Sequence, residues 1–259
     1  MTLEYVALGS SYAAGPGLGD RVRTRPRQAG QSRHNYAHLV AARLAAELTD
    51  VTSSGATTLD LLETSQFGQP PQVEALTPST GLVTITAGGN DVGYLPGVIM
   101  ATLPSLVRRL PRLRAVADAT LDPQGFDDRL AEVGPRLVRL VEEVHRRSPE
   151  ARVLLVDYLT LLPPEPMSAV RGLSSDEQRL LRAVGDRLAA ATAEASTRSD
   201  AELVTASRAS LDHHAWSADP WTTSVAAIAP WRAGVPFHPN RTGMRVVAGL
   251  VVDAITSGR

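Results

Sequence analysis

Short runs of apolar, often β-branched residues alternate along the chain with longer stretches of helical spacing. The short runs are bounded by turn residues and predict strands over 3–8, 50–54, 81–87, 152–158 and 202–207. Leu and Val recur every three or four positions in the longer stretches and predict helices over 35–48, 124–147, 175–198 and about 242–256. Ser174 and Glu177, at the start of the third helix, have the spacing of a capping box. This alternation predicts a mostly parallel sheet with helices on both faces.

The size and charge of the chain narrow the class of protein. The chain has 259 residues, of which 43% are hydrophobic, and this is enough for one sizeable core, so we expect a single domain over 1–259. The formal net charge of −1 gives no electrostatic reason to expect nucleic acid or an anionic membrane as a partner. The chain has no cysteine, which excludes disulfides and cysteine-based metal sites.

The first residues, "MTLEYVALGS", lack the basic region and apolar core of a signal peptide. No apolar run approaches the ~18 residues that a transmembrane helix needs. We therefore expect a soluble, cytoplasmic protein without a transmembrane segment. A secreted protein given without its signal peptide fits the same pattern.

Small and polar residues follow the first three predicted strands. Gly9, Ser10 and Ser11 follow the first, "SSGATT" follows the second, and "GGND" follows the third. Because ligands bind at the carboxyl ends of parallel strands, we expect these loops to gather at one edge of the sheet. Ordinary turns also use glycine and serine. In the third loop, however, two glycines before Asn90 bring the backbone and an amide donor close to whatever binds there.

A serine nucleophile needs a base, and the chain has six histidines. Three fit surface positions near the basic loop or at a solvated helix end: His34, His38 and His145. His213 and His214 could reach the pocket or bind a metal with Asp212, although a third ligand at a defined spacing is missing. His238 lies in a proline-flanked loop just before the last predicted helix, from which its side chain can be directed into a site.

Together these segments resemble the SGNH, or GDSL-type, serine hydrolases, and within them the actinobacterial lipase and esterase branch. "GSSYAAGPG" resembles the nucleophile block GDSxxxG, "SSGAT" the glycine block, "VTITAGGNDVGY" the GGND block and "FHPNRTGM" the terminal HPNxxG block. Four blocks in order are far more specific than any one alone. The resemblance covers most of the chain and implies a flavodoxin-like three-layer α/β/α sandwich that needs no metal or organic cofactor.

The resemblance also implies roles for individual residues. Ser11 matches the nucleophile, because Ser10 stands where the family has aspartate, and His238 matches the general base. The backbone amides of Ser11 and Gly55, with the side-chain amide of Asn90, match a three-donor oxyanion hole.

The sequence departs from the family pattern at the position of the triad acid. The aspartate three residues before the histidine is replaced by Val235. Some relatives in this branch are Ser-His dyads oriented by a main-chain carbonyl at this position, so the resemblance implies that the Val235 carbonyl orients the histidine. Asp219, and after it Asp212, are the alternative acids. The cysteines of secreted relatives are replaced here by Ala29 and Trp216.

Three further features leave alternatives open. The loop beside the nucleophile is either solvated and mobile or a clamp for an acidic substrate, and it is rich in arginine: Arg21, Arg23, Arg25, Arg27 and Arg33. The apolar residues 94–120 either shield an acyl pocket or pack against the core. Three tryptophans before the histidine either line the site or pack in the interior: Trp216, Trp221 and Trp231.

We expect a carboxylic ester hydrolase that acts on a small-molecule acyl ester through an acyl-enzyme. The alternative is a binding protein that keeps the fold but has weak or no catalysis. The sequence does not distinguish lipid, sugar acetate and small aryl esters, and it leaves the oligomeric state open, although a monomer fits.

Overall fold

The computed structural model describes residues 2–164, 170, 172–224 and 234–257. Within this part of the chain, five strands form one sheet in the order β2–β1–β3–β4–β5, and every neighbouring pair is parallel. The strands are β1 (Glu4–Gly9), β2 (Glu47–Asp50), β3 (Leu82–Thr86), β4 (Arg152–Val156) and β5 (Glu202–Val204). The prediction of a mostly parallel sheet is confirmed.

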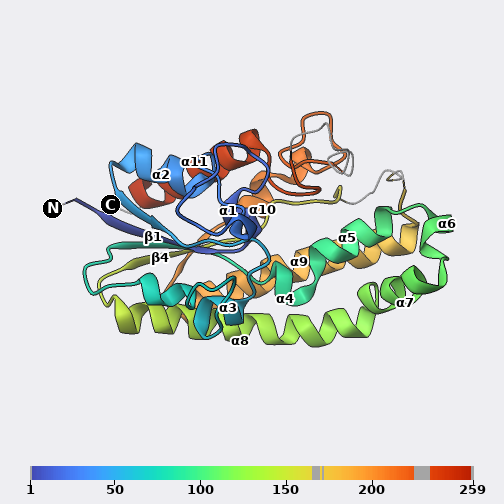
Figure 1. Cartoon of the computed structure of the whole chain (residues 1–259), viewed down its shortest axis with the longest axis horizontal. Coiled ribbons are helices and arrows are strands. Elements are labelled where there is room, and N and C mark those ends of the chain that lie inside the picture. The colour runs from blue at the N-terminus through green and yellow to red at the C-terminus, as the bar shows by residue number, and fades with distance from the viewer. Residues whose placement is uncertain (1, 165–169, 171, 225–233, 258–259) are drawn as a thin grey trace.

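Helices cover both faces of the sheet (Figure 1). On one face α2 packs against α11, and on the other α8 packs against α9. The helices are α1 (Ser11–Ala14), α2 (Tyr36–Leu44), α3 (Thr58–Leu62), α4 (Gly89–Val92), α5 (Tyr94–Thr102), α6 (Ser105–Arg108), α7 (Pro111–Thr120), α8 (Pro123–Arg147), α9 (Ser175–Arg198), α10 (Ala206–Ala209) and α11 (Arg241–Ser257), with short 3-10 helices η1 (Arg27–Ala29), η2 (Gln72–Ala75) and η3 (Leu211–His213). The expected three-layer arrangement is confirmed. None of the helices in the described residues is long and apolar enough to span a bilayer.

The elements form where the sequence predicts continuous burial or helical spacing. All five residues of β3 are buried, as are all residues of β1 after the first. Such runs are typical of parallel strands with helices on both sides. The buried residues of α8 recur every three or four positions: Phe126, Leu130, Val133, Leu137, Leu140, Val141 and Val144. At the start of α9, Ser174 and Glu177 form the predicted capping box.

The second strand and the helix before it differ from the prediction. The helix predicted over 35–48 ends at Leu44, because Ala45 adopts a left-handed conformation with φ 50°, and residues 47–50 form β2. β2 is an edge strand with the polar sequence ELTD, so its apolar pattern is too weak to be recognised. The residues predicted as a strand, 50–54, continue past β2 as a loop that still binds the end of β1 through Val51 and Ser53.

Candidate active site

Three loops meet at the carboxyl edge of the sheet, as the sequence predicts. α1 follows β1, the loop 51–57 follows β2, and α4 follows β3. The Ser53 amide donates to the carbonyl of Gly9 at 2.9 Å, and the Ser10 amide donates to the carbonyl of Thr86 at 2.9 Å. The loops are therefore joined through their backbones, and they hold the side chains that the sequence analysis singles out.

Ser11 is the first residue of α1, immediately after a tight turn. A Cβ atom on Gly9 would lie only 2.7 Å from the carbonyl oxygen of Thr86, so only glycine fits there. Ser10 is extended and caps the helix, and the Ser11 amide is one of the unpaired donors at its start. Within the described residues the Ser11 hydroxyl makes no hydrogen bond, although the side chain is buried. The hydroxyl and the backbone amide of Ser11 are thus both without a hydrogen-bond partner among the described residues.

The residue after Ser11 joins its helix to the histidine loop. The Tyr12 hydroxyl donates to the carbonyl of Phe237 at 2.6 Å, and the Tyr12 ring lies 5.6 Å from the ring of His238, between centroids. At the first residue of α11, the guanidinium of Arg241 donates to the carbonyl of Leu18 at 2.8 Å. These contacts bring two segments from opposite ends of the sequence side by side.

The carbonyl that orients His238 is that of Pro236, so the assignment of this role to Val235 is wrong. His238 Nδ1 lies 2.8 Å from the Pro236 carbonyl oxygen. The Val235 carbonyl instead accepts hydrogen bonds from the Thr223 hydroxyl and from the His238 backbone amide. The turn at Phe237, whose φ is +59°, directs the carbonyl two residues before the histidine toward the ring. A left-handed phenylalanine is rare, and such strain is concentrated at functional sites.

This contact determines which nitrogen of His238 is free. A carbonyl oxygen only accepts hydrogen bonds, so in the neutral ring Nδ1 carries the proton that it donates to Pro236. Nε2 is then the lone-pair nitrogen and can accept a proton. Burial lowers the pKa of His238 from its ordinary value, and the Pro236 carbonyl raises the pKa by a smaller amount.

The two alternative acids do not contact His238. Asp219 is 76% exposed, and its carboxylate lies 3.5 Å from Nδ1 of His213. Asp212 is exposed. It raises the pKa of His214, but burial lowers that pKa by a larger amount. Within the described residues, the only partner of the His238 ring nitrogens is therefore a main-chain carbonyl.

The tryptophans before the histidine pack in different places. The Trp216 ring lies 5.5 Å from the ring of Phe237, and so supports the strained turn from one side. Trp221 stacks on His213 with ring centroids 3.9 Å apart. Trp231 lies outside the described residues.

Gly55 and Asn90 are held next to each other at the same edge. The Asn90 side-chain amide donates to the carbonyl of Ala56 at 2.8 Å, which leaves its second N–H without a protein partner among the described residues. The Gly55 amide also donates to no described residue. Asp91 accepts hydrogen bonds from the amide and hydroxyl of Thr58, so α4 is tied to the start of α3. Two free donors are thus fixed in position.

Sequence reasoning missed Tyr158, which supports this edge from the end of β4. The Gly89 amide donates to the Tyr158 hydroxyl at 3.0 Å, and the same hydroxyl shares a hydrogen bond with Ser10 Oγ, 3.1 Å away. Its ring lies 4.7 Å from that of Tyr12. Burial raises the pKa of Tyr158 to about 12, which keeps the phenol protonated. Its place at the end of the predicted strand 152–158 is a signal of this role, but a tyrosine there equally fits core packing.

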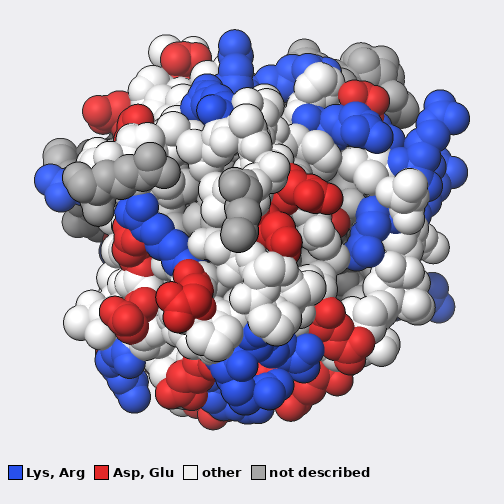
Figure 2. Space-filling model, turned by 90° about the vertical axis from the view of Figure 1, so that its left-hand side faces the viewer, with Lys and Arg blue, Asp and Glu red and all other residues white. Residues whose placement is uncertain are grey.

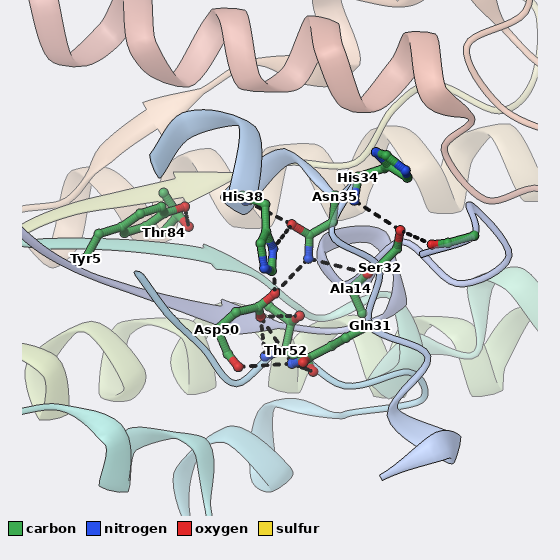
Figure 3. A network of polar contacts seen from close by, with 11 residues as sticks. Tyr5, Ala14, Gln31, Ser32, His34, Asn35, His38, Asp50, Thr52 and Thr84 are labelled. Atoms are coloured by element: carbon green, nitrogen blue, oxygen red, sulfur yellow. Dashed lines mark hydrogen bonds and ion pairs between the residues drawn. The ribbon is translucent and has the colours of Figure 1, made fainter. Parts of the chain in front are cut away.

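A buried polar network holds the residues that lead to Gly55 (Figure 3). The Asp50 side chain is only 5% exposed and accepts hydrogen bonds from the Thr52 amide, the Thr52 hydroxyl and the side-chain amide of Asn35. The Gln31 side-chain amide donates to the Thr52 carbonyl at 2.6 Å. Hydrogen bonds therefore hold the amide, the hydroxyl and the carbonyl of Thr52, three residues before Gly55.

His38 completes this network at its outer side. Its Nδ1 lies 3.0 Å from Asn35 Oδ1 and 3.5 Å from the Asp50 carboxylate (Figure 3). Burial raises the pKa of Asp50, and the hydrogen bonds to the carboxylate lower the pKa by a smaller amount. His38, predicted as a surface residue, is in fact partly buried with 23% of its side chain exposed.

Comparison with known proteins places the chain in a described family. The family model of the GDSL-like lipase/acylhydrolase family matches residues 7–246. The chain is 33% identical to Lipase 2 of Streptomyces coelicolor, over 98% of this chain and 86% of that protein. Its structure is similar to phospholipase A1 from Streptomyces albidoflavus, with a TM-score of 0.78 and 24% identity over 98% of this chain and 99% of that one. The extracellular lipase from Streptomyces rimosus has the same TM-score and identity, with 98% and 100% coverage. The two structures confirm the fold.

The network around Asp50 leads to a stability prediction. Asp50→Asn places an N–H₂ group among donors that need an acceptor, so we expect the free energy of unfolding to fall by about 1–3 kcal/mol. Urea denaturation followed by circular dichroism measures this change. Glu47→Gln, at the exposed start of the same strand, is the control and should be close to neutral. Equal stability of the two variants would contradict the structural role of the network.

Proposed function

The chain belongs to the GDSL-like lipase/acylhydrolase family and is a serine ester hydrolase, and we propose that it acts with Ser11 as nucleophile and His238 as general base. The observation that carries this assignment is the hydrogen bond from His238 Nδ1 to the Pro236 carbonyl. It leaves Nε2 free to take a proton, on a loop that Tyr12 joins to the helix of Ser11.

The reaction proceeds in two displacements. Ser11 Oγ attacks the ester carbonyl carbon while His238 Nε2 takes the hydroxyl proton, and a tetrahedral intermediate forms. The intermediate collapses, the bond to the alcohol breaks, and His238 gives its proton to the leaving alcohol. Water then attacks the acyl-enzyme with His238 again as base, which releases the acid and restores Ser11.

Three N–H groups are proposed to stabilise the negative oxygen of the intermediate: the amides of Ser11 and Gly55 and the side chain of Asn90. Their lack of other acceptors and the fixed position of Asn90 against Ala56 support this role. Donors that are already in place require no reorganisation during the reaction, and each can contribute ~10²- to 10³-fold in rate.

A dyad without a carboxylate is proposed to be slower than a full triad. The Pro236 carbonyl fixes the ring of His238 and its tautomer as an aspartate would. It is neutral, however, and stabilises the imidazolium less than a carboxylate does. We therefore expect a working hydrolase of modest rate.

The names of the similar proteins, lipase and phospholipase A1, support a lipid ester as the substrate. A fluorophosphonate probe tests the proposed serine nucleophile, because only an activated serine is labelled.

The first prediction tests the nucleophile. Ser11→Ala should abolish hydrolysis of a soluble p-nitrophenyl ester and labelling by a fluorophosphonate. Ser10→Ala should keep both, because the Tyr158 hydroxyl still accepts from the Gly89 amide when Ser10 Oγ is removed. Mass spectrometry of the labelled peptide distinguishes the two serines. An inactive Ser10→Ala variant beside an active Ser11→Ala variant would show that the assignment is wrong, and an unlabelled natural protein would contradict an activated serine.

A second prediction tests the dyad. Asp219→Asn and Asp212→Asn should each change kcat by less than about tenfold, whereas loss of a true triad aspartate costs ~10⁴ in the serine proteases. Steady-state kinetics on the soluble ester measures this, with circular dichroism to check the fold. A thousandfold drop in either variant would identify that residue as the acid and reject the dyad.

A third prediction concerns pH. His238 must be neutral to act as base, and its buried environment lowers its pKa, so the base form persists to lower pH than for an exposed histidine. We expect kcat/KM to be half-maximal below the ordinary histidine value of about 6.5 and to fall as the pH decreases further. Absorbance at the isosbestic wavelength of p-nitrophenol gives the profile. A midpoint above that value would contradict the environment described for His238.

A further inference from the structure

The segment between α5 and α8 exposes large apolar side chains to solvent. Within the described residues there are six exposed large hydrophobic side chains, and four of them lie here: Leu106, Val107, Leu110 and Val116. Leu106 is 77% exposed and Leu110 is 55% exposed. α6 buries none of its residues, and α7 buries only Ala117. The described residues of α6 and α7 thus pack little into the core, unlike α5, which buries five of its residues.

The same segment carries more positive than negative charge. Residues 103–122, between α5 and α8, contain four arginines and two aspartates, although the whole chain has a net charge of −1. Arg108 is paired with Glu177. Arg109 and Arg112 are exposed and form no ion pair with a described residue. Arg114 is 75% exposed and pairs with Asp118 at 3.8 Å. The low net charge therefore conceals a local positive surface.

We define the α6–α7 surface as Leu106, Val107, Leu110 and Val116 with Arg109, Arg112 and Arg114. Exposed apolar groups rimmed by polar residues mark interaction sites for proteins or membranes. Interspersed arginine and aliphatic side chains are the composition that binds the headgroup region of an anionic bilayer, with the charges at the phosphates and the apolar groups between the acyl chains.

The α6–α7 surface lies at the end of the molecule toward which the carboxyl ends of the strands point (Figure 1). α5 runs from α4, which carries Asn90, out to α6. The opposite end, shown in Figure 2, has acidic and basic side chains interspersed rather than one sign of charge. α6 and α7 are therefore at the end of the molecule that the carboxyl edge of the sheet faces.

We propose that the α6–α7 surface docks on an anionic lipid bilayer and so brings the active site to ester lipids at the membrane surface. The inference rests on the proposed function for its purpose, since it names bilayer lipid as the form in which the substrate is met. The binding itself depends only on residues 106–116 and is independent of Ser11.

The test measures binding and hydrolysis separately. The Ser11→Ala chain, which leaves the lipid intact, is incubated with vesicles of phosphatidylcholine mixed with phosphatidylglycerol, and with vesicles of phosphatidylcholine alone, and bound protein is separated by flotation. We expect binding to the anionic vesicles. Leu106→Ser with Leu110→Ser should weaken it at least about tenfold, through loss of two inserted side chains.

Charge variants and a matched control define the surface further. Arg109→Gln with Arg112→Gln should weaken binding to the anionic vesicles about thirtyfold and leave binding to pure phosphatidylcholine unchanged. Leu211→Ser removes another exposed leucine, in η3, and should bind as the parent does. All these variants, in the chain with Ser11 present, should hydrolyse a soluble ester at the parent rate.

Three results would overturn the proposal. The first is a chain that hydrolyses the soluble ester but does not bind vesicles of either composition. The second is equal loss of binding in the Leu211 variant, which would make the effect unspecific. The third is a dimer, by sedimentation, that the Leu106 and Leu110 substitutions dissociate and that does not bind vesicles. Failure to hydrolyse the soluble ester instead contradicts the proposed function and leaves the binding result standing.

Discussion

The hydrogen bond between the His238 ring and the Pro236 carbonyl decides what the rest of the site can do. It places the proton on Nδ1 and leaves Nε2 as the acceptor without any carboxylate. The bond depends on the left-handed turn at Phe237, a conformation that the chain keeps only because its surroundings hold it. Phe237 is fully buried, and its carbonyl accepts the Tyr12 hydroxyl. The helix that carries Ser11 thus stabilises the turn that orients His238.

The side of the site with the proposed oxyanion donors Gly55 and Asn90 depends on a different set of contacts. The loop 51–57 follows an edge strand. Val51 and Ala56 pack into the core, and polar groups hold the residues around them. Asp50 and Gln31 hold Thr52, and the Asn90 amide binds the Ala56 carbonyl. These bonds are buried or partly buried, where an unpaired polar group costs free energy, and this makes the arrangement specific. The cost of burying Asp50 is the reason for its raised pKa.

Much of the fold could be predicted from sequence because its central elements are continuous in pattern. β1 and β3 are apolar runs buried on both faces, and α8 and α9 have clear helical spacing. β2 could not, since a short polar edge strand has no distinctive period. Its location was missed by several residues.

The candidate site was likewise predictable only in part. Motifs located Ser11, Asn90 and His238 on loops that the parallel sheet brings to one edge, although their catalytic roles stay predictions. The orienting carbonyl was placed one residue too early, because the sign of φ at Phe237 cannot be inferred from the residue type. Tyr158 was missed since its polar contacts, to Ser10 and Gly89, depend on three strands meeting.

A crystal structure of the protein after reaction with a phosphonate ester tests the arrangement most directly. The phosphorus should be bonded to Ser11 Oγ, with one phosphonyl oxygen within hydrogen-bonding distance of the Ser11 amide, the Gly55 amide and the Asn90 side chain. His238 Nε2 should face the Ser11 oxygen, with Nδ1 still bound to the Pro236 carbonyl. A carboxylate on Nδ1, or a phosphonyl oxygen turned away from Gly55 and Asn90, would contradict the proposed dyad and its oxyanion hole.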